Sequence, residues 1–390
     1  MANTFKFGNG IWATKKGSTL AYNDENGNYK PLPFNFERAS GATRVNKDGL
    51  IEVVGNNKPR IDFKDSADGS LLLEPARTNL VTYSEAFDNA YWAKSGSSVT
   101  SGFISPDGTA NAFKLVANSN NGYIDKQSIS ISNTTSYASS VYIKRIFGSG
   151  NVLIRDVNGN DVIKTITSEW EKHTVIATSN STSGNFRITL ANSGDEVLIY
   201  AAQLEQGSYP TSYIPTNGSA VTRVAEICNN GGNEQVINST EGVWYYEMST
   251  PDEQLKITRI TDGTSSNYII LYSLSANSMR AVISVGGVVQ FFFDAPVTLT
   301  NMNKFALRWN GTSYSYFVNG VNVANGAGLS FPINTLNNVS FLNEAGIYPF
   351  EGNVKDLRVY NTALTDVELE YMTSYRSLNE MVTELNLNAL

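Results

Sequence analysis

The chain has 390 residues, of which 17% are charged, and its formal net charge is −7. This length predicts two to four domains, each able to bury a core of its own. An acidic chain lacks the basic surface that displaces counterions from nucleic acid, so binding to nucleic acid without regard to sequence is excluded.

Pairs of Asn or Asp followed by Gly occur along nearly the whole chain, for example at residues 26–27, 158–159 and 319–320. Such pairs accept the positive φ of tight hairpin turns. Short runs of β-branched and aromatic residues lie between them, and helical periodicity is almost absent before residue 364. The pattern predicts an all-β chain whose strands reverse repeatedly.

Residues 1–80 are predicted to form an extended β region at the N-terminus. Its extended pieces are short, and Pro59 and Pro75 interrupt strand pairing because proline donates no backbone hydrogen bond. Little of this region reads as an independent core, so we expect neighbouring copies of the chain to stabilise it.

Residues 81–225 are predicted to form a first β-sandwich. Residues 139–145 (SSVYIKR) and 185–190 (NFRITL) alternate as half-buried strands do. The unit ends with residues 202–216 (AQLEQGSYPTSYIPT), whose prolines hold the exit extended. We therefore expect a linker to begin near residue 216.

Residues 226–376 are predicted to form a second β-sandwich. Phe305, Leu307 and Trp309 alternate on one face of a strand, which predicts that this face is buried. Asn-Gly turns then connect this strand to residues 313–318 and 321–323, which predicts a three-stranded meander.

A short helix is predicted at the C-terminal end, and residues 377–390 are expected to form a helical tail. Residues 365–368 (TDVE) fit a capping box, in which Thr365 caps the helix and Glu368 reaches back. This segment either lies on the second sandwich or forms a short coiled-coil seam between subunits. Residues 377–380 (SLNE) would start another helix and break the seam. The apolar positions that recur at three- and four-residue steps are Leu364, Val367, Tyr371, Tyr375, Leu378, Val382 and Leu385.

Three runs in the N-terminal third occur in a characteristic order: residues 36–45 (FERASGATRV), 59–63 (PRIDF) and 71–80 (LLLEPARTNL). With residues 84–92 (SEAFDNAYW), they resemble a module of tailed-bacteriophage fibre and head-spike proteins. The resemblance covers roughly residues 34–97. It implies a virion surface protein, usually trimeric, whose N-terminal part anchors it to capsid or tail proteins.

The ends of the two predicted sandwiches carry further resemblances. Residues 202–216 resemble the last strand of jelly rolls in the same phage proteins, which are similar to carbohydrate-binding modules. Residues 350–365 (FEGNVKDLRVYNTALT) resemble the ending of concanavalin A-like and laminin-G-like jelly rolls. The fold expected is therefore all-β, with two jelly-roll sandwiches after an extended β region and a short C-terminal helix.

Four polar residues of the N-terminal runs are predicted to act at the junction between domains. They are Arg38, Arg60, Arg77 and Asn79. Arginine and asparagine side chains can satisfy backbone groups where strands end. We expect these residues to hold the fold together and to touch no ligand.

The side chains available for nucleophilic or metal chemistry are few. The only histidine, His173, would have to serve a Ser-His-Asp hydrolase, but no nucleophile elbow accompanies it, so an exposed strand histidine is expected. His173 and the single cysteine, Cys228, cannot supply an ordinary zinc site, and Cys228 is expected to be a small buried or half-buried residue. No cofactor is predicted; calcium stays open, although residues 156–161 (DVNGND) fit a hairpin turn better than a calcium loop.

Glycan cleavage is the main enzymatic alternative, because the concanavalin A-like jelly rolls that residues 350–365 resemble include glucanases. Such enzymes need two carboxyl groups across the scissile bond, and the glucanases place them on one strand as Glu-x-Asp-x-x-Glu. No Glu-x-Asp occurs here, and Glu205, Glu247, Glu351 and Asp356 stand apart. We therefore predict that the protein is not an enzyme, although carboxylates from distant strands can converge.

Aromatic residues supply the candidate sugar-binding surface, because a sugar ring stacks its C–H face on Trp or Tyr. Successive aromatics in residues 243–247 (VWYYE) must point to opposite faces of a strand, so one of its faces can be exposed. Tyr314 and Tyr316 are two residues apart beside a turn, so both point to the same face of their strand. The candidate ligand-binding residues are Trp244, Tyr246, Tyr314 and Tyr316.

These observations predict a bacteriophage virion structural protein, a head or tail fibre, spike or decoration protein that adheres to host-surface or environmental glycans. A glycan depolymerase of the phage particle and a secreted bacterial lectin are the alternatives. Residues 1–6 lack the apolar core of a signal peptide, so synthesis in the host cytoplasm and a final place on the virion surface are expected. No apolar run approaches the roughly 18 residues that span a membrane, so no membrane insertion is expected.

Overall fold

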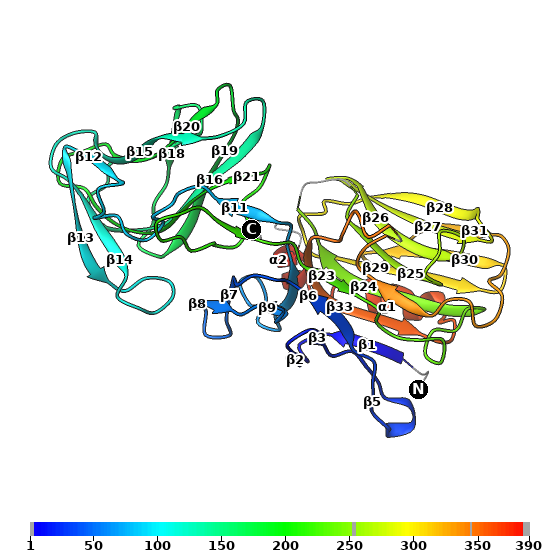
Figure 1. The fold of residues 1–390 in the computed structure, drawn as a ribbon. Helices are drawn as coiled ribbons and strands as arrows, with labels where there is room; N and C mark the ends of the chain where they lie inside the picture. Colours follow the sequence, from blue (N-terminus) through cyan, green and yellow to red (C-terminus); the bar gives the residue numbers. More distant parts are fainter. Residues whose placement is uncertain (1–3, 252–254, 344, 385–390) are drawn as a thin grey trace. The chain divides into compact units, whose positions relative to one another are not determined.

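The computed structural model describes residues 4–251, 255–343 and 345–384 (Figure 1). They form antiparallel sheets and short C-terminal helices, which confirms the predicted all-β class. The chain divides into two compact units. Unit 1 contains residues 1–39, 55–75 and 225–390, and unit 2 contains residues 40–54 and 76–224.

Unit 1 is a β-sandwich whose strands alternate between a core face and an outer face. In its larger sheet, β10 (Ser70–Leu73) pairs with β33 (Gly352–Tyr360) and with β9 (Arg60–Asp62). The other strands of this sheet follow in the order β31 (Val321–Ala327), β30 (Ser313–Val318), β29 (Asn303–Asn310), β24 (Glu241–Ser249), β33 (Gly352–Tyr360), β1 (Thr4–Gly8), β4 (Tyr22–Asn23) and β5 (Lys30–Pro31).

The second layer of unit 1 is a smaller sheet that shares one hydrophobic core with the larger sheet. Its strands are β28 (Val288–Pro296), β27 (Ser278–Val285), β26 (Tyr268–Ser275), β25 (Ile257–Thr261) and β32 (Asn338–Ser340). A short additional sheet contains β2 (Thr14–Lys15), β3 (Ser18–Thr19), β6 (Phe34–Glu37) and β23 (Ile227–Asn229), and the 3-10 turn η1 (Glu25–Gly27) follows β4. The predicted meander is present as β29, β30 and β31.

The N-terminal segment completes this sandwich. The register pairs Phe5 with Val359 and Phe7 with Leu357, so β1 lies directly beside β33 (Figure 1). Phe5, Phe7 and Leu71 are buried in the same core as the C-terminal strands. Residues 1–80, expected to be one region supported by neighbouring copies, are instead divided between the two units. The reason is that their apolar strand faces are covered within this chain.

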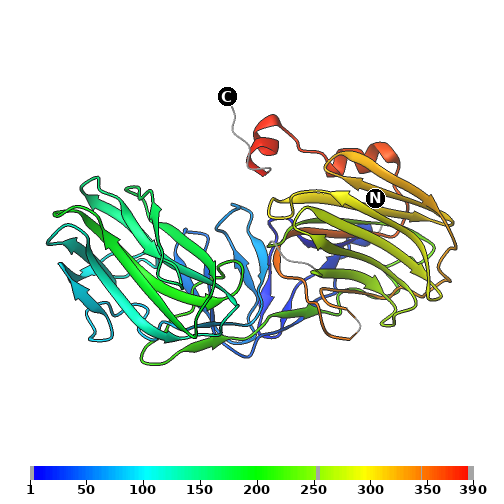
Figure 2. The same cartoon turned by 90° about the horizontal axis from the view of Figure 1, so that it is seen from above.

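Two helices follow β33. The helix α1 (Asp366–Thr373) begins with the predicted capping box: Glu368 N–H donates to the Thr365 hydroxyl, and the Glu368 carboxylate accepts from Thr365 N–H. Leu369 buries α1 against the outer face of the larger sheet (Figure 2). Non-helical residues separate α1 from α2 (Leu378–Glu384), so the helical pattern is interrupted, as the second capping pattern predicted.

The position of Leu385 and the end of the predicted tail lie outside the described residues, as do residues 1–3. The coiled-coil seam between subunits stays a prediction. Among the described residues, the helices are too short and too polar to cross a membrane.

Unit 2 is a separate sandwich with a core of its own. One sheet contains β12 (Ala93–Ser95), β15 (Gly122–Ser130), β20 (Ser183–Leu190), β17 (Val152–Arg155) and β18 (Asp161–Lys164). The other sheet contains β13 (Ser97–Phe103), β14 (Ala112–Ala117), β21 (Glu196–Gln206), β16 (Ser136–Phe147) and β19 (Glu171–Thr178). Two pairs complete it: β7 (Ala42–Val45) with β8 (Ile51–Val54), and β11 (Arg77–Asn79) with β22 (Val221–Arg223).

A buried ionic cluster ties together the chain segments of unit 1. We call it the Glu226 cluster; it consists of Arg38, Arg60, Glu74 and Glu226. Arg38 Nη1 lies 2.6 Å from Glu226 Oε1, and Arg60 Nε lies 2.8 Å from the same oxygen. Arg60 Nη2 bonds to Glu226 Oε2 and lies 2.8 Å from Glu74 Oε2, while Glu74 N–H donates to Glu226 at 3.0 Å.

We predict that Glu226→Gln lowers the free energy of unfolding of unit 1 by about 3–5 kcal/mol. The side chains of Arg38, Arg60 and Glu226 are fully buried, so the substitution removes the negative charge that both guanidinium groups share away from water. Glu74, which still faces Arg60, balances only one of the two positive charges. Urea unfolding, followed by tryptophan fluorescence, measures the change.

Glu25→Gln is the matched control. It removes the same charge from a solvent-exposed ion pair with Lys30. The side chain of Lys30 is 57% exposed and that of Glu25 is 41% exposed. Its effect should stay below about 1 kcal/mol. Equal effects of the two substitutions would contradict the structural role of Glu226.

Candidate functional site

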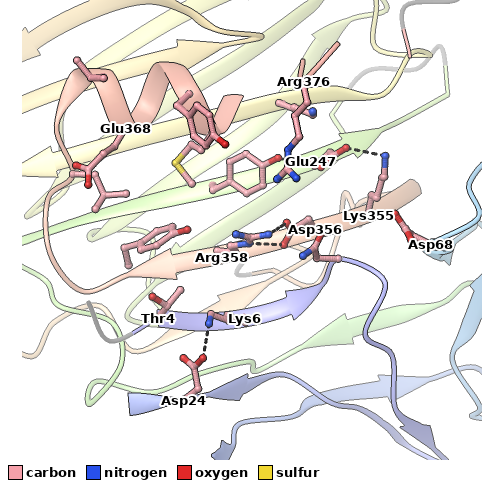
Figure 3. Close-up of a pocket in the computed structure, with 18 of the residues that line it drawn as sticks. Thr4, Lys6, Asp24, Asp68, Glu247, Lys355, Asp356, Arg358, Glu368 and Arg376 are labelled. Atoms are coloured by element: carbon pink, nitrogen blue, oxygen red, sulfur yellow. Dashed lines mark hydrogen bonds and ion pairs between the residues drawn. The ribbon is translucent and has the colours of Figure 1, made fainter. Parts of the chain in front are cut away.

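A groove on the outer face of the larger sheet is the candidate site. Its volume is about 1140 Å³, and residues from the N-terminal segment, from β24, β29 and β33, and from the C-terminal helices line it. Figure 3 shows charged side chains rising from the sheet, with α1 along one side. We call this feature the groove below.

Strand alternation explains which side chains form the floor of the groove. Along β24, Trp244 and Tyr246 point into the core, so Tyr245 and Glu247 point to the outer face. The register places Glu247 directly opposite Asp356 on β33 and shifts immediately after this pair, at a β-bulge. Such irregularities re-aim side chains on a sheet. The floor therefore carries two carboxylates on neighbouring strands.

The carboxylates of the floor are bound by basic side chains. Arg358 donates to both oxygens of Asp356, at 3.1 Å from Nε and 2.6 Å from Nη2. Lys355 Nζ lies 3.1 Å from Glu247 Oε1, and the Tyr245 hydroxyl donates to Glu247 Oε2 at 3.0 Å. Both pairs are drawn in Figure 3. The floor is thus a connected polar network.

Burial and charge change the proton affinity of this network. Burial raises the pKa of Asp356 to about 6; Arg358 and Lys355 act against the rise, and the Glu247 carboxylate adds to it. Burial also raises the pKa of Tyr245 well above its usual value, reinforced by Glu247 and Asp356. Asp356 therefore titrates in the mildly acidic range.

The sides of the groove add further ion pairs and an apolar wall. Lys6 Nζ on β1 lies 2.6 Å from Asp24 Oδ2, and Lys304 Nζ on β29 lies 2.5 Å from Glu380 Oε1 on α2. Tyr371 on α1 lines the groove and is 75% exposed. The groove combines hydrogen-bonding groups with accessible apolar surface.

The four aromatic residues predicted to bind ligand do not lie in the groove. Trp244, Tyr246, Tyr314 and Tyr316 are at most 1% exposed and belong to the core, so the prediction of a binding surface there is wrong. The smaller sheet covers the face on which they lie. Strand alternation correctly predicted that Tyr245 points to the opposite face of β24 from Trp244 and Tyr246. The prediction assigned the ligand to the face of Trp244 and Tyr246, which is the buried face. Trp309 is a core residue, as predicted.

The structure places two of the predicted junction residues, Arg38 and Arg60, in the Glu226 cluster. In unit 2, Arg77 lies over the ring of Tyr209 at 5.2 Å and donates to the carbonyl of Ala76 at 3.3 Å. These arginines therefore make structural contacts outside the groove.

Asn79 satisfies backbone groups in unit 2, as predicted. Its amide nitrogen donates to the carbonyls of Ala202 and Ile214, at 3.1 and 2.9 Å. Its amide oxygen accepts from the N–H groups of Val81 and Leu204, at 3.1 and 3.2 Å. One buried side chain thus joins three segments of the unit.

The remaining candidates for chemistry lie apart from one another. His173 is on β19 but half-buried rather than exposed, with a pKa lowered mainly by burial. Asp156 receives the N–H groups of Asn158 and Asn160 in a turn between β17 and β18, which confirms the predicted hairpin. Cys228 is buried, as predicted. Among the described residues, no three His, Cys, Asp or Glu side chains are grouped to hold a metal ion.

The groove itself was not found from sequence. Glu247 and Asp356 are far apart in the sequence, and they lie opposite each other only because β24 and β33 are neighbouring strands. Alternation in residues 243–247 was a usable signal, since it predicted that Tyr245 and Glu247 share a face. Glu351 instead bonds to Lys256 at 2.5 Å, and Glu205 belongs to unit 2.

Residues 229–370 match a family described as the Concanavalin A-like lectin/glucanases superfamily. This match confirms the lectin-like part of the resemblance found in the sequence. It covers most of the C-terminal portion of unit 1, including β24 and β33. No protein among the curated sequences matches the chain.

Several solved structures are similar to parts of the chain. The sialidase carbohydrate-binding module CBM40 of Ruminococcus gnavus, bound to α2,3-sialyllactose, is 23% identical, covers 35% of this chain and 83% of its own, and has a TM-score of 0.31. The tandem CBM22 domains of Paenibacillus barcinonensis Xyn10C are 9% identical, covering 74% and 99%, with a TM-score of 0.27. Domains LG4-5 of the mouse laminin α1 chain are 11% identical, covering 69% and 94%, also with a TM-score of 0.27.

We predict that the titration of Asp356 makes unit 1 more stable in mild acid. The folded-state pKa of about 6 exceeds the usual value near 4, so the folded state binds the proton more tightly. This contribution is fully present below about pH 4 and is lost as the pH rises through about 6. The unfolding free energy, relative to that of Asp356→Asn, should rise by up to about 3 kcal/mol between pH 7 and pH 4.

Urea unfolding of both proteins at several pH values measures this difference, and effects of other titrating groups cancel in it. A difference that is constant with pH, or that falls in acid, would contradict the assignment.

Proposed function

We propose that this chain is a glycan-binding structural protein of a tailed-bacteriophage particle. The observation that carries the glycan part is the groove, which lies on the sandwich containing the lectin-like segment. Sugars present many hydroxyl groups that both donate and accept hydrogen bonds. A site for them therefore needs donors, acceptors and an apolar surface close together.

The groove supplies these three features. Arg358 and Lys355 are donors on the floor, the exposed carboxylates of Asp68 and Glu368 in the lining are acceptors, and Tyr371 offers an accessible ring. The volume of about 1140 Å³ exceeds the roughly 300–1,000 Å³ of pockets for small ligands. The groove therefore has room for an oligosaccharide rather than a single sugar.

We propose binding without cleavage. Asp356 is 2% exposed and Glu247 6% exposed, and both are held by neighbouring side chains. A catalytic acid and a nucleophile or base must instead reach the glycosidic oxygen and the anomeric carbon. Because neighbouring side chains already hold both carboxylates by hydrogen bonds, we propose that these carboxylates position the donors of the floor.

A depolymerase is the second candidate. The observation that favours it is the pairing of Glu247 with Asp356, whose raised pKa is suited to a general acid. Incubation with bacterial surface polysaccharide and measurement of new reducing ends separates the two candidates. Our proposal expects none, and reducing ends that vanish in Asp356→Asn would establish cleavage.

The virion part of the proposal is supported by the ordered runs in residues 34–97, which resemble phage fibre and head-spike proteins. Under this proposal the protein lies on the virion surface and binds capsid or tail proteins. It would assemble as a homotrimer and contact host-surface glycans through the groove. A secreted bacterial lectin remains the alternative.

We predict that Tyr371→Ala weakens binding to a retained glycan by about tenfold, because loss of a stacked ring costs roughly 1.5 kcal/mol. Purified protein on an array of bacterial surface polysaccharides provides the measurement. Tyr371 is exposed, so its replacement should leave folding unchanged.

Phe292→Ala is the matched control, since Phe292 is a 62% exposed aromatic outside the groove, on β28. Binding that depends on Phe292 and not on Tyr371 would place the sugar elsewhere. An array on which no glycan is retained would contradict glycan binding itself.

We also predict that antibodies against the purified protein label intact phage particles in electron micrographs. Light scattering should give the mass of a trimer. A stable monomer that labels no particle would count against the virion assignment while leaving the glycan assay unaffected.

A further inference from the structure

The ligand class of the groove follows from how its charges are arranged. Among the described residues that line it, five are basic and six are acidic. We infer that the groove selects uncharged glycans and discriminates against glycans that carry carboxyl groups. This inference rests on the proposed glycan-binding function and narrows it to one chemical class.

Basic side chains of the groove are already committed to acids of the groove. Lys355 lies 3.1 Å from Glu247, and Arg358 makes two hydrogen bonds to Asp356. A ligand carboxylate is bound tightly when a guanidinium or ammonium group offers it short, paired hydrogen bonds. Here the paired hydrogen bonds of Arg358 end on Asp356, and the ammonium of Lys355 faces Glu247 in an ion pair, so a ligand carboxylate would have to displace a protein carboxylate.

The same compensation recurs away from the floor. Lys6 is paired with Asp24, and Lys304 with Glu380 on α2. Arg376 reaches from the C-terminal segment toward the floor, where Glu247 and Asp356 supply negative charge (Figure 3). No part of the lining described here combines several basic groups without a nearby acid.

An uncharged glycan meets a different surface. The paired groups keep hydrogen-bonding capacity, because a carboxylate accepts several hydrogen bonds and an ammonium donates three. Hydroxyl groups can join these networks without separating the ion pairs. A carboxylated sugar would instead bring another negative charge beside Glu247, Asp356 and Glu380, which like-charge repulsion opposes.

Glu247 is the residue whose replacement tests this selection. Its side chain is nearly buried, and it compensates Lys355 on the floor. Glu247→Gln keeps an oxygen that can accept from Tyr245 but removes the negative charge that faces Lys355 and would repel a ligand carboxylate. Lys355→Gln makes the opposite change, because it leaves Glu247 uncompensated.

The experiment uses the full chain on an array of paired probes, one uncharged and the other carrying carboxyl groups. Suitable pairs are oligogalactose with oligogalacturonate, and lactose with α2,3-sialyllactose. Where a pair is retained, the neutral member should bind about tenfold tighter or more. Its binding should change little up to about 1 M salt, which screens charge–charge attraction.

The variants should shift this preference in opposite directions. Glu247→Gln should reduce the preference for the neutral member several-fold, and Lys355→Gln should increase it. Glu37→Gln is the matched control, since it removes the same charge from an exposed position on β6 outside the groove. An unchanged circular dichroism spectrum and a cooperative thermal transition above the assay temperature establish that each variant folds.

Tighter binding of the carboxylated members by the unchanged protein would overturn the inference, and so would equal effects of Glu247→Gln and Glu37→Gln. If the unchanged protein prefers the carboxylated members and Tyr371→Ala loses that binding, the groove does bind glycans. In that case only the inferred ligand class is wrong. Retention of neither member of any pair would reject the proposed function and this inference together.

Discussion

The buried carboxylate of Glu226 is the constraint on which the arrangement of unit 1 depends. Its two oxygens hold the guanidinium groups of Arg38 and Arg60 and the backbone N–H of Glu74. These residues come from separate segments of the chain, and Arg38, Glu74 and Glu226 each stand within two residues of a point where the chain passes between the units. Burying such charges is costly unless every partner is present, so the four segments must be positioned together.

The cluster connects to the groove through the larger sheet. Arg60 begins β9, which pairs with β10, and β10 pairs in turn with β33. Further along β33 lie Asp356 and Arg358, on the floor of the groove. The N-terminal strand β1 flanks β33 on the same sheet and adds Lys6. Segments that the sequence placed in a separate anchoring region therefore help to build the candidate site.

The sequence predicted features that depend on neighbouring residues. Asn-Gly turns, strand alternation, the capping box at Thr365 and the hairpin after Arg155 are all present. It did not predict features set by strand order, because the partner of a strand is chosen by the whole fold. Trp244 and Tyr246 share a face, as alternation requires, but only the covering sheet shows that this face is the core. The pairing of Glu247 with Asp356 escaped prediction for the same reason.

The central claim is that an uncharged glycan occupies the groove on the outer face of the larger sheet. A crystal structure of the protein soaked with a neutral oligosaccharide retained on the array tests it most directly. The account predicts sugar density between Arg358 and the exposed ring of Tyr371, with the Lys355–Glu247 and Arg358–Asp356 pairs intact. Sugar bound instead beside Phe292 on the smaller sheet, or within unit 2, would contradict it.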